Sequence, residues 1–325
     1  MSRPDVRENG PPEAGGVGRR HAPTSPPSFR EGRIEAALRT LELTVRRRLD
    51  GLLQGNHLGL VPGPGSEPGE SRLYVPGDDV RHMDWAATAR TTAPHVRETM
   101  ADRELETWVV MDLSASLDFG TATCEKRDLA IAALAAVTHL TRGGGNRIGV
   151  LVANGEELVR IPARGGLAHA QGMLRRVANT PRPAEGTRGD LAAAVEQLRR
   201  PPRRRGLAVV ISDFLGEPEW ERPLRALSAR HELLAVEVLD PRELELPDVG
   251  TVVLADPESG KQREVTITPL LAREFAAAAA EHRDQVAATL RRCGAAHLVL
   301  RTDADWIADV VRFVLARKRA WSGGR

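Results

Sequence analysis

Aromatic residues are scarce in this chain. Phe, Trp and Tyr together make up 3% of its 325 residues, and tyrosine occurs once. The hydrophobic share of 41% therefore comes mainly from Leu, Val, Ile and Ala, which must build the core. Few aromatic rings are present on which nucleic-acid bases could stack, and the net charge is only +2. Both observations predict that nucleic acid is not a partner.

Cysteine is also scarce, and long apolar runs are absent. Cys124 and Cys293 lie far apart and form no C-x-x-C pair, which argues against a disulfide framework or a zinc site. No apolar run approaches the length of a membrane span. The first residues also lack the apolar region of a secretory signal. We therefore expect no membrane span and a cytoplasmic location.

The first third of the chain shows two different patterns. Residues 1–30 are rich in Pro, Gly, Arg and Glu without periodicity, which predicts a disordered tail. From residue 34 to 53 apolar residues recur at steps of three and four, as in an amphipathic helix. Short strand-like runs and turns follow from residue 71 to 105. We expect residues 31–105 to form an N-terminal helix and a small β segment.

Residues 106–320 alternate between strand-length apolar runs and helix-length periodic segments. This alternation predicts an α/β domain with a mostly parallel sheet and helices on both faces. A hairpin is expected as an insertion at about 250–268, and the run "EELVRIPA" is expected as an antiparallel arm at the sheet edge. The expected strands are 107–113, 147–153, 207–212, 233–239 and 297–301, and the expected helices are 126–141, 167–179, 190–199, 219–229, 269–292 and 305–319.

A cluster of oxygen-bearing side chains follows the first of these strands. The stretch "WVVMDLSASLDFG" places Asp112, Ser114 and Ser116 directly after an apolar run. Ligand sites in open parallel sheets form at the carboxyl ends of strands. A carboxylate and two hydroxyls are hard ligands that suit Mg²⁺ or Mn²⁺ rather than zinc.

Two further residues are placed to join this cluster. Asp213 ends another apolar strand in "VVISDFLG", and Thr187 lies in the Gly-flanked loop of "EGTRGDLAAAV". Asp190 could serve in place of Thr187. A simpler interpretation is that the acid and the serines only cap the next turn. We expect a metal site built by Asp112, Ser114, Ser116, Thr187 and Asp213.

In composition and in order, this set resembles the metal-ion-dependent adhesion site of von Willebrand factor A domains. Those domains carry D-x-S-x-S after the first strand, Thr in a middle loop and Asp after a later strand. The resemblance implies a von Willebrand factor A-like domain. It also implies a bound ion that keeps one coordination position open for the carboxylate of a partner protein.

A second resemblance is more specific. The stretches "YVPGDDVRHMDWAATART", "HVRE", "DLSASLDFG" and "NRIGVLVA" resemble the bacterial family called domain of unknown function fifty-eight. The similarity covers roughly residues 33–319. It implies a short N-terminal segment joined to a von Willebrand factor A-like domain, and a MoxR-type AAA+ ATPase or its client as the partner. Many members carry N-terminal membrane helices, which have no counterpart in this sequence.

The acidic stretch "PGDDVRHMDW" could form a second metal site, but a structural role is the better interpretation. Its proline and glycine favour a turn, its acids can accept backbone N–H bonds, and its arginine can pair with an acid. Its tryptophan is expected to pack on the sheet domain as an anchor. The structural residues of this motif are Pro76, Gly77, Asp78, Asp79, Arg81, Asp84 and Trp85.

Catalysis is not expected from these residues. A phosphatase of the haloacid dehalogenase type needs an acid two residues after its aspartate, where this chain has Ser114. A serine hydrolase needs a histidine, and only His139 or His169 could approach the serines in space. We expect a non-enzymatic, metal-dependent protein-binding module that acts as adaptor or co-chaperone. The alternatives are a metal-dependent hydrolase and a scaffold whose site has lost its metal.

Overall fold

The computed structural model describes residues 24–29, 33–53, 71–75, 83–91, 93–97, 105–142, 145–184, 187, 189–199, 206–255 and 261–322. Six strands form one sheet in the order β10–β7–β6–β3–β4–β5. Neighbouring strands run parallel, except that β5 is antiparallel to β4 at the sheet edge. The predicted sheet and its edge arm are confirmed. The strands are β3 (Glu106–Asp112), β4 (Arg147–Ala153), β5 (Leu158–Arg164), β6 (Gly206–Ser212), β7 (His231–Leu239) and β10 (Ala295–Arg301).

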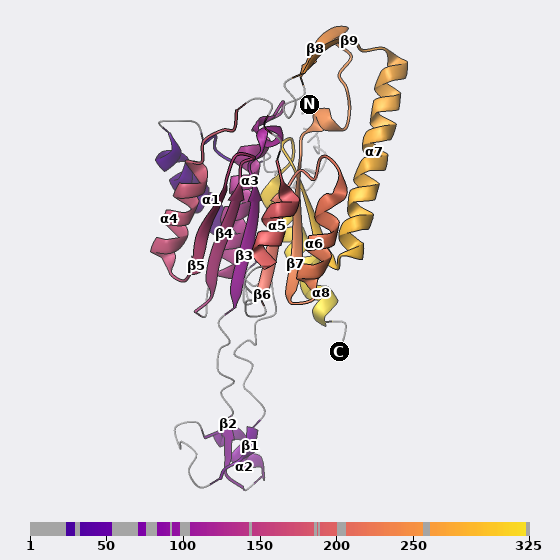
Figure 1. The fold of residues 1–325 in the computed structure, drawn as a ribbon. Helices are drawn as coiled ribbons and strands as arrows, with labels where there is room; N and C mark the ends of the chain where they lie inside the picture. Colours follow the sequence, from indigo (N-terminus) through magenta and orange to yellow (C-terminus); the bar gives the residue numbers. More distant parts are fainter. Residues whose placement is uncertain are drawn as a thin grey trace, which may run out of the picture.

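Helices cover both faces of this sheet (Figure 1). Alternate residues of each strand point to opposite faces, so β3 sends Val109 and Met111 to one core and Trp108 and Val110 to the other. None of the helices in the described ranges is both long enough and apolar enough to cross a membrane. On the first face lie α1 (Ile34–Leu52), α3 (Lys126–Thr141), α4 (Leu167–Ala178) and α8 (Trp306–Ser322); on the second lie α5 (Leu191–Arg199), α6 (Glu221–Ser228) and α7 (Pro269–Arg292).

The N-terminal helix α1 is part of the main core. Its buried stripe of Ala37, Leu41, Val45 and Leu49 packs on the face formed by α3, α4 and α8. Within the predicted disordered tail 1–30, residues 24–29 are described. Phe29 is buried there, and its N–H donates to Asp128 Oδ1 at 2.9 Å. The prediction of disorder is therefore wrong for this stretch, because one apolar ring and one buried carboxylate hold it on α3.

The predicted hairpin is also present. β8 (Thr251–Ala255) pairs antiparallel with β9 (Gln262–Thr266) as a separate two-stranded sheet. It lies at the start of α7, on the side of the domain toward which the parallel strands run (Figure 1). Val253 and Leu254 of β8 are exposed. The hairpin therefore extends from the domain and does not widen the main sheet.

A second small unit stands apart from the sheet domain at its opposite end (Figure 1). β1 (Ser71–Leu73) pairs antiparallel with β2 (His95–Arg97), and α2 (Trp85–Thr91) packs beside them. Asp84 begins α2, and its Oδ1 accepts the N–H groups of Ala86 and Ala87, both at 3.0 Å. The structural role predicted for this acid is thus visible as a helix cap.

The prediction for Trp85 is wrong. Its side chain is 71% exposed on the first turn of α2 and does not anchor the unit to the sheet domain. Val96 and Ala87 fill the small core of the unit instead, and a short helix has only one face to bury. The other residues of the motif, Pro76, Gly77, Asp78, Asp79 and Arg81, lie outside the described residues.

Candidate functional site

The topology brings two of the predicted site residues together. β3 and β6 are parallel neighbours in register, with Met111 opposite Ile211. Asp112 is the last residue of β3, and Asp213 directly follows β6. The hydroxyl of Ser212 donates to Asp112 Oδ2 at 2.7 Å, which joins the two strand ends. Both aspartates are buried at the carboxyl edge of the sheet.

After β3 the chain curls tightly, as a three-residue ligand set requires. The N–H of Ser114 donates to Asp112 Oδ1 at 3.0 Å, and a 3₁₀ turn follows over Ala115–Asp118. The hydroxyl oxygens of Ser114 and Ser116 come within 3.2 Å of each other. The cluster therefore joins Asp112 and both serines, and the Ser212 hydroxyl links Asp112 to the strand end that carries Asp213.

The loop before α5 also reaches this cluster. A Cβ on Gly189 would lie 2.7 Å from Ser114 Cβ and 3.7 Å from Asp112 Oδ1, so only glycine allows this approach. Thr187 is half-buried in the same loop, two residues away, and its N–H donates to the carbonyl of Ala184. Asp190 is exposed, and its Oδ1 caps α5 by accepting the N–H of Ala193 at 2.7 Å. Asp190 therefore has a structural role, and Thr187 stays a prediction as the ligand from this loop.

Two charged residues that the sequence analysis did not assign to the site lie inside it. Lys126, the first residue of α3, is completely buried, and its Nζ is 2.8 Å from Asp213 Oδ2. The same ammonium pairs with Glu243. One signal was available in the sequence: residues 129–137 are all apolar, so this helix is buried on every side and the charges at its start are buried too. Another was D-x-x-E at Asp240–Glu243, the pattern of a helix capping box.

These charged neighbours shift the pKa values of the two aspartates in opposite directions. Burial raises the pKa of Asp112, and the nearby charge of Asp213 raises it further. Burial alone would also raise the pKa of Asp213, but the ammonium of Lys126 lowers it below its ordinary value. The pKa of Lys126 is itself raised: burial opposes this, and the charges of Asp213 and Glu243 outweigh burial. Asp213 and Lys126 therefore form a buried ion pair.

Apolar side chains form the rim of the site. Phe214 has φ 52°, a strained value for a residue with a side chain. Its ring is buried against Trp220, 5.1 Å between centroids, which holds the turn in place. The next residue, Leu215, is 39% exposed, and Phe119 on the other side of Lys126 is 38% exposed. The turn thus presents apolar surface beside the buried charges.

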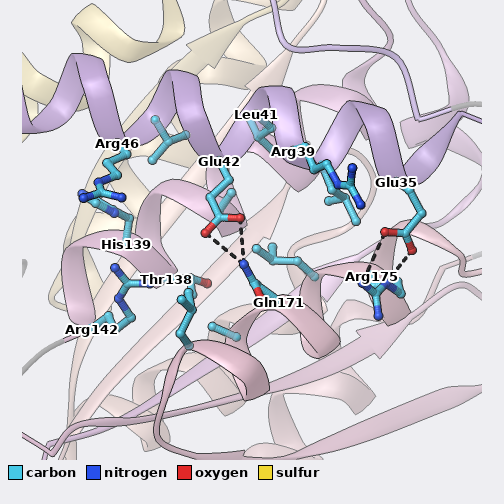
Figure 2. A pocket seen from close by; sticks show the side chains of 16 residues that line it. Glu35, Arg39, Leu41, Glu42, Arg46, Thr138, His139, Arg142, Gln171 and Arg175 are labelled. Carbon is cyan, nitrogen blue, oxygen red and sulfur yellow. Dashed lines mark hydrogen bonds and ion pairs between the residues drawn. The ribbon is translucent and has the colours of Figure 1, made fainter.

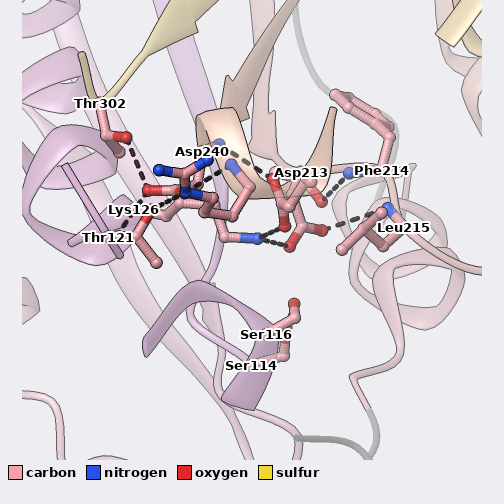
Figure 3. A network of polar contacts seen from close by, with 12 residues as sticks. Ser114, Ser116, Thr121, Lys126, Asp213, Phe214, Leu215, Asp240 and Thr302 are labelled. Atoms are coloured by element: carbon pink, nitrogen blue, oxygen red, sulfur yellow. Dashed lines mark hydrogen bonds and ion pairs between the residues drawn. The ribbon is translucent and has the colours of Figure 1, made fainter. Parts of the chain in front are cut away.

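Asp240 ties the surrounding loops together (Figure 3). Its carboxylate accepts the N–H and hydroxyl of Thr121 at 2.8 and 2.5 Å, and the hydroxyl of Thr302 at 2.8 Å. Burial raises the pKa of Asp240, but these hydrogen bonds lower it overall. The loop between β3 and α3 is therefore fastened to the ends of β7 and β10.

The donor set suits a hard divalent ion. Octahedral Mg²⁺ holds oxygen ligands at about 2.0–2.1 Å, so adjacent ligands lie about 3 Å apart. The hydroxyls of Ser114 and Ser116, 3.2 Å apart, have nearly this spacing. Asp112 supplies a carboxylate beside them, and Asp213 follows the end of the neighbouring strand β6. These residues therefore fit Mg²⁺ or Mn²⁺.

Neither histidine considered for hydrolysis lies at this strand edge. His139 is near the opposite end of α3 from Lys126, and its Nε2 is 2.9 Å from Asp50 Oδ1. His169 Nε2 is 3.0 Å from the carbonyl oxygen of Ile148, near the amino end of β4. The idea that one of them approaches the serines is wrong, because parallel strands place their amino and carboxyl ends at opposite edges.

A separate hollow of about 280 Å³ lies between α1, α3 and α4 (Figure 2). Its floor includes Leu41 and Val45, which belong to the core. Polar contacts cross it from α1 to α4: Glu35 pairs with Arg175, and Glu42 accepts from Gln171 Nε2 at 3.0 Å. The hollow is therefore part of the seam along which α1 docks, away from the strand-end cluster.

Comparison with solved structures finds matches at low sequence identity. The conserved hypothetical protein BatB from Bacteroides thetaiotaomicron is 15% identical, with 66% of this chain and 99% of that chain covered and a TM-score of 0.41. The von Willebrand factor type A structure from Catenulispora acidiphila is 12% identical, with 68% and 43% covered and a TM-score of 0.33. The predicted α/β architecture, a mostly parallel sheet with helices on both faces, is confirmed by the strand order and by the two cores of this chain.

Sequence comparisons find relatives of much higher identity. An uncharacterized protein of Mycobacterium tuberculosis is 65% identical over 304 residues, which cover 92% of this chain and 96% of that protein. An uncharacterized protein of Mycobacterium avium is 60% identical over 168 residues, 52% of this chain and 99% of that protein. A family model matches residues 70–285, which include the strand-end cluster and the β1–β2–α2 unit. The chain belongs to the family described as protein of unknown function DUF58.

Proposed function

We propose that the chain is a metal-dependent protein-binding module without catalytic activity. The observation that carries the proposal is the set of oxygen donors at the ends of β3 and β6, with Ser114 and Ser116 spaced as neighbouring ligands of one ion. Two hydroxyls are neutral ligands, so an ion held there keeps positive charge. A carboxylate from a partner protein is the natural group to complete its coordination.

The surface around the donors supports a protein partner. Phe119 and Leu215 are exposed apolar side chains at the rim, and protein interfaces combine apolar contact area with a few polar anchors. Water exclusion by such a rim strengthens the attraction between the ion and a carboxylate, because the local dielectric falls. The proposed partner is a MoxR-type AAA+ ATPase or a client it delivers, with this chain as adaptor or co-chaperone.

The test is co-purification of the chain with a MoxR-type ATPase in Mg²⁺ or in EDTA. We expect EDTA and Asp112→Ala each to reduce the recovered complex at least about tenfold while both proteins stay folded. Asp284→Ala, which removes an exposed acid on α7, is the matched control and should change nothing. Recovery that is undiminished in EDTA and for Asp112→Ala would exclude the metal-bridged complex.

A second function is favoured by one specific observation. The β1–β2–α2 unit exposes Trp85 at 71%, Leu73 at 59% and Val75 at 56%, an apolar surface that suits a partner protein. A scaffold that binds through this unit needs no metal. Its complex would survive EDTA and would be lost in Trp85→Ala, which separates it from the first proposal.

A further inference from the structure

Lys126 is a buried cation in contact with Asp213, one of the predicted metal ligands. Its Nζ is 2.8 Å from Asp213 Oδ2, and its side chain is completely buried (Figure 3). Glu243 pairs with the same ammonium from the opposite loop. The ring of Phe119 lies 5.9 Å from Nζ and helps to cover it. The chain thus places a cation of its own beside the oxygen donors.

A buried pair of Lys126 and Asp213 contributes little to folding stability. A buried ion pair seldom gains more from attraction than it loses by leaving water. Lys126 is also the first residue of α3, where the helix dipole disfavours a positive charge. A role at the site accounts for this position better than a contribution to stability.

One of the two aspartates, Asp213, is already paired with a cation of the chain itself. Its Oδ2 accepts from Lys126, and its Oδ1 accepts the N–H of Leu215 at 3.2 Å. Asp112 differs, because its partners are the neutral hydroxyl of Ser212 and the N–H of Ser114. Of the two aspartates, only Asp213 is held by a cation.

We propose that Lys126 is a positioning residue that keeps Asp213 out of direct metal coordination, an inference that rests on the proposed metal site. With Asp213 held by the ammonium, the direct protein ligands are Asp112 and the two serines. Only one of them is charged, so the ion retains positive charge and one more position for the carboxylate of a partner. Lys126 thereby weakens metal binding and favours an acidic ligand.

The experiment is a Mn²⁺ titration by calorimetry, with water-proton relaxation to count the water molecules bound to the ion. Lys126→Met keeps the length of the side chain and removes its charge. We expect this variant to bind Mn²⁺ at least about tenfold more tightly than wild type, because a nearby repelling charge is gone. We also expect it to hold one water fewer on the ion, since Asp213 then coordinates directly. Arg142→Met, at the other end of α3, is the matched control and should leave both values unchanged.

A double-mutant cycle separates coordination from simple charge removal. In wild type, Asp213→Asn should cost less than about threefold in affinity, whereas in the Lys126→Met background it should cost at least about tenfold. Equal costs in the two backgrounds, or equal hydration in wild type and Lys126→Met, would overturn the proposal. If Lys126→Met does not fold, the double variant Lys126→Met/Glu243→Gln is used in its place in every measurement, because it removes one charge of each sign.

The outcomes also separate this inference from the proposed function. Mn²⁺ binding that follows the expected pattern, together with a partner complex that does not depend on the metal, would end the proposed function and leave the inference standing. Equal Mn²⁺ affinity and equal hydration in wild type and Lys126→Met would end the inference and leave the proposed function standing. No binding by either chain would end both.

Discussion

The strand-end cluster and the β1–β2–α2 unit differ in what surrounds their polar residues. In the cluster Asp112, Lys126 and Asp213 are all buried, and each has a partner from a distant part of the chain. In the small unit Asp84 caps its own helix, and Trp85 faces outward. Both stretches combine acids with a tryptophan nearby in the sequence. Such residues become a buried site only where a large sheet and its loops surround them. The small unit has only the two strands β1 and β2.

The largest effect is expected inside the sheet domain. Trp108 is 1% exposed in β3, and its ring lies under the guanidinium of Arg160 at 4.5 Å. Trp108→Ala should lower the free energy of unfolding by about 3–5 kcal/mol, because the cavity cannot collapse in a closely packed core. Urea denaturation followed by circular dichroism measures this change. A loss below about 1 kcal/mol would mean that the second face is loosely packed.

The next effect concerns the loops that hold the cluster. Asp240→Asn removes the charge that accepts three hydrogen bonds from Thr121 and Thr302, so at pH 7 it should cost about 1–3 kcal/mol of unfolding free energy. The pKa of Asp240 is lowered on folding from 3.8. Its contribution is therefore complete above that value and is lost as the pH falls through the folded pKa.

Measuring the unfolding free energy of both chains at pH 7 and near pH 2 checks the sign. The difference between wild type and Asp240→Asn should shrink at the lower pH. A difference that grows on acidification would show that the carboxylate is not the stabilising form.

A smaller effect tests how closely the loop before α5 packs on the cluster. Gly189→Ala places a Cβ 2.7 Å from Ser114 Cβ, and the resulting shift should weaken Mn²⁺ binding about tenfold, within the usual 1–3 kcal/mol cost of overpacking. Gly172→Ala is the matched control. Its Cβ meets nothing within 4 Å in α4, so it should leave Mn²⁺ binding unchanged and stabilise the helix by up to about 1 kcal/mol. Calorimetry measures the Mn²⁺ affinity, and thermal melting measures the stability. Equal Mn²⁺ affinities of wild type and Gly189→Ala would place the loop outside the site.

The smallest effect is expected in the β1–β2–α2 unit. Trp85→Ala should change the free energy of unfolding by less than about 0.5 kcal/mol, because the side chain is already 71% exposed. The same urea experiment used for Trp108→Ala measures it. A loss of several kcal/mol would show that the small unit docks on the sheet domain after all.

Local pattern predicted most of the fold. The bounds of β4, α3 and α7 agree with the predicted 147–153, 126–141 and 269–292. Apolar spacing reveals such elements because each segment must bury one or both of its faces. It also located Asp112 and Asp213 at strand ends, and the register of β3 with β6 then places those ends side by side.

The sequence by itself determined the elements of the sheet domain, the sheet type and the polar residues at the strand ends, since each follows from the spacing of neighbouring residues. It did not predict α2, which lies where only short strands and turns were expected. Only the tertiary structure decided the partners. Lys126 meets Asp213 across 87 residues of chain and Glu243 across 117, and no local pattern encodes such a contact. Trp85 is the opposite case, since its size predicts burial and only the surface available to the small unit leaves it exposed. Burial depends on which surfaces meet, and that is a property of the folded chain as a whole.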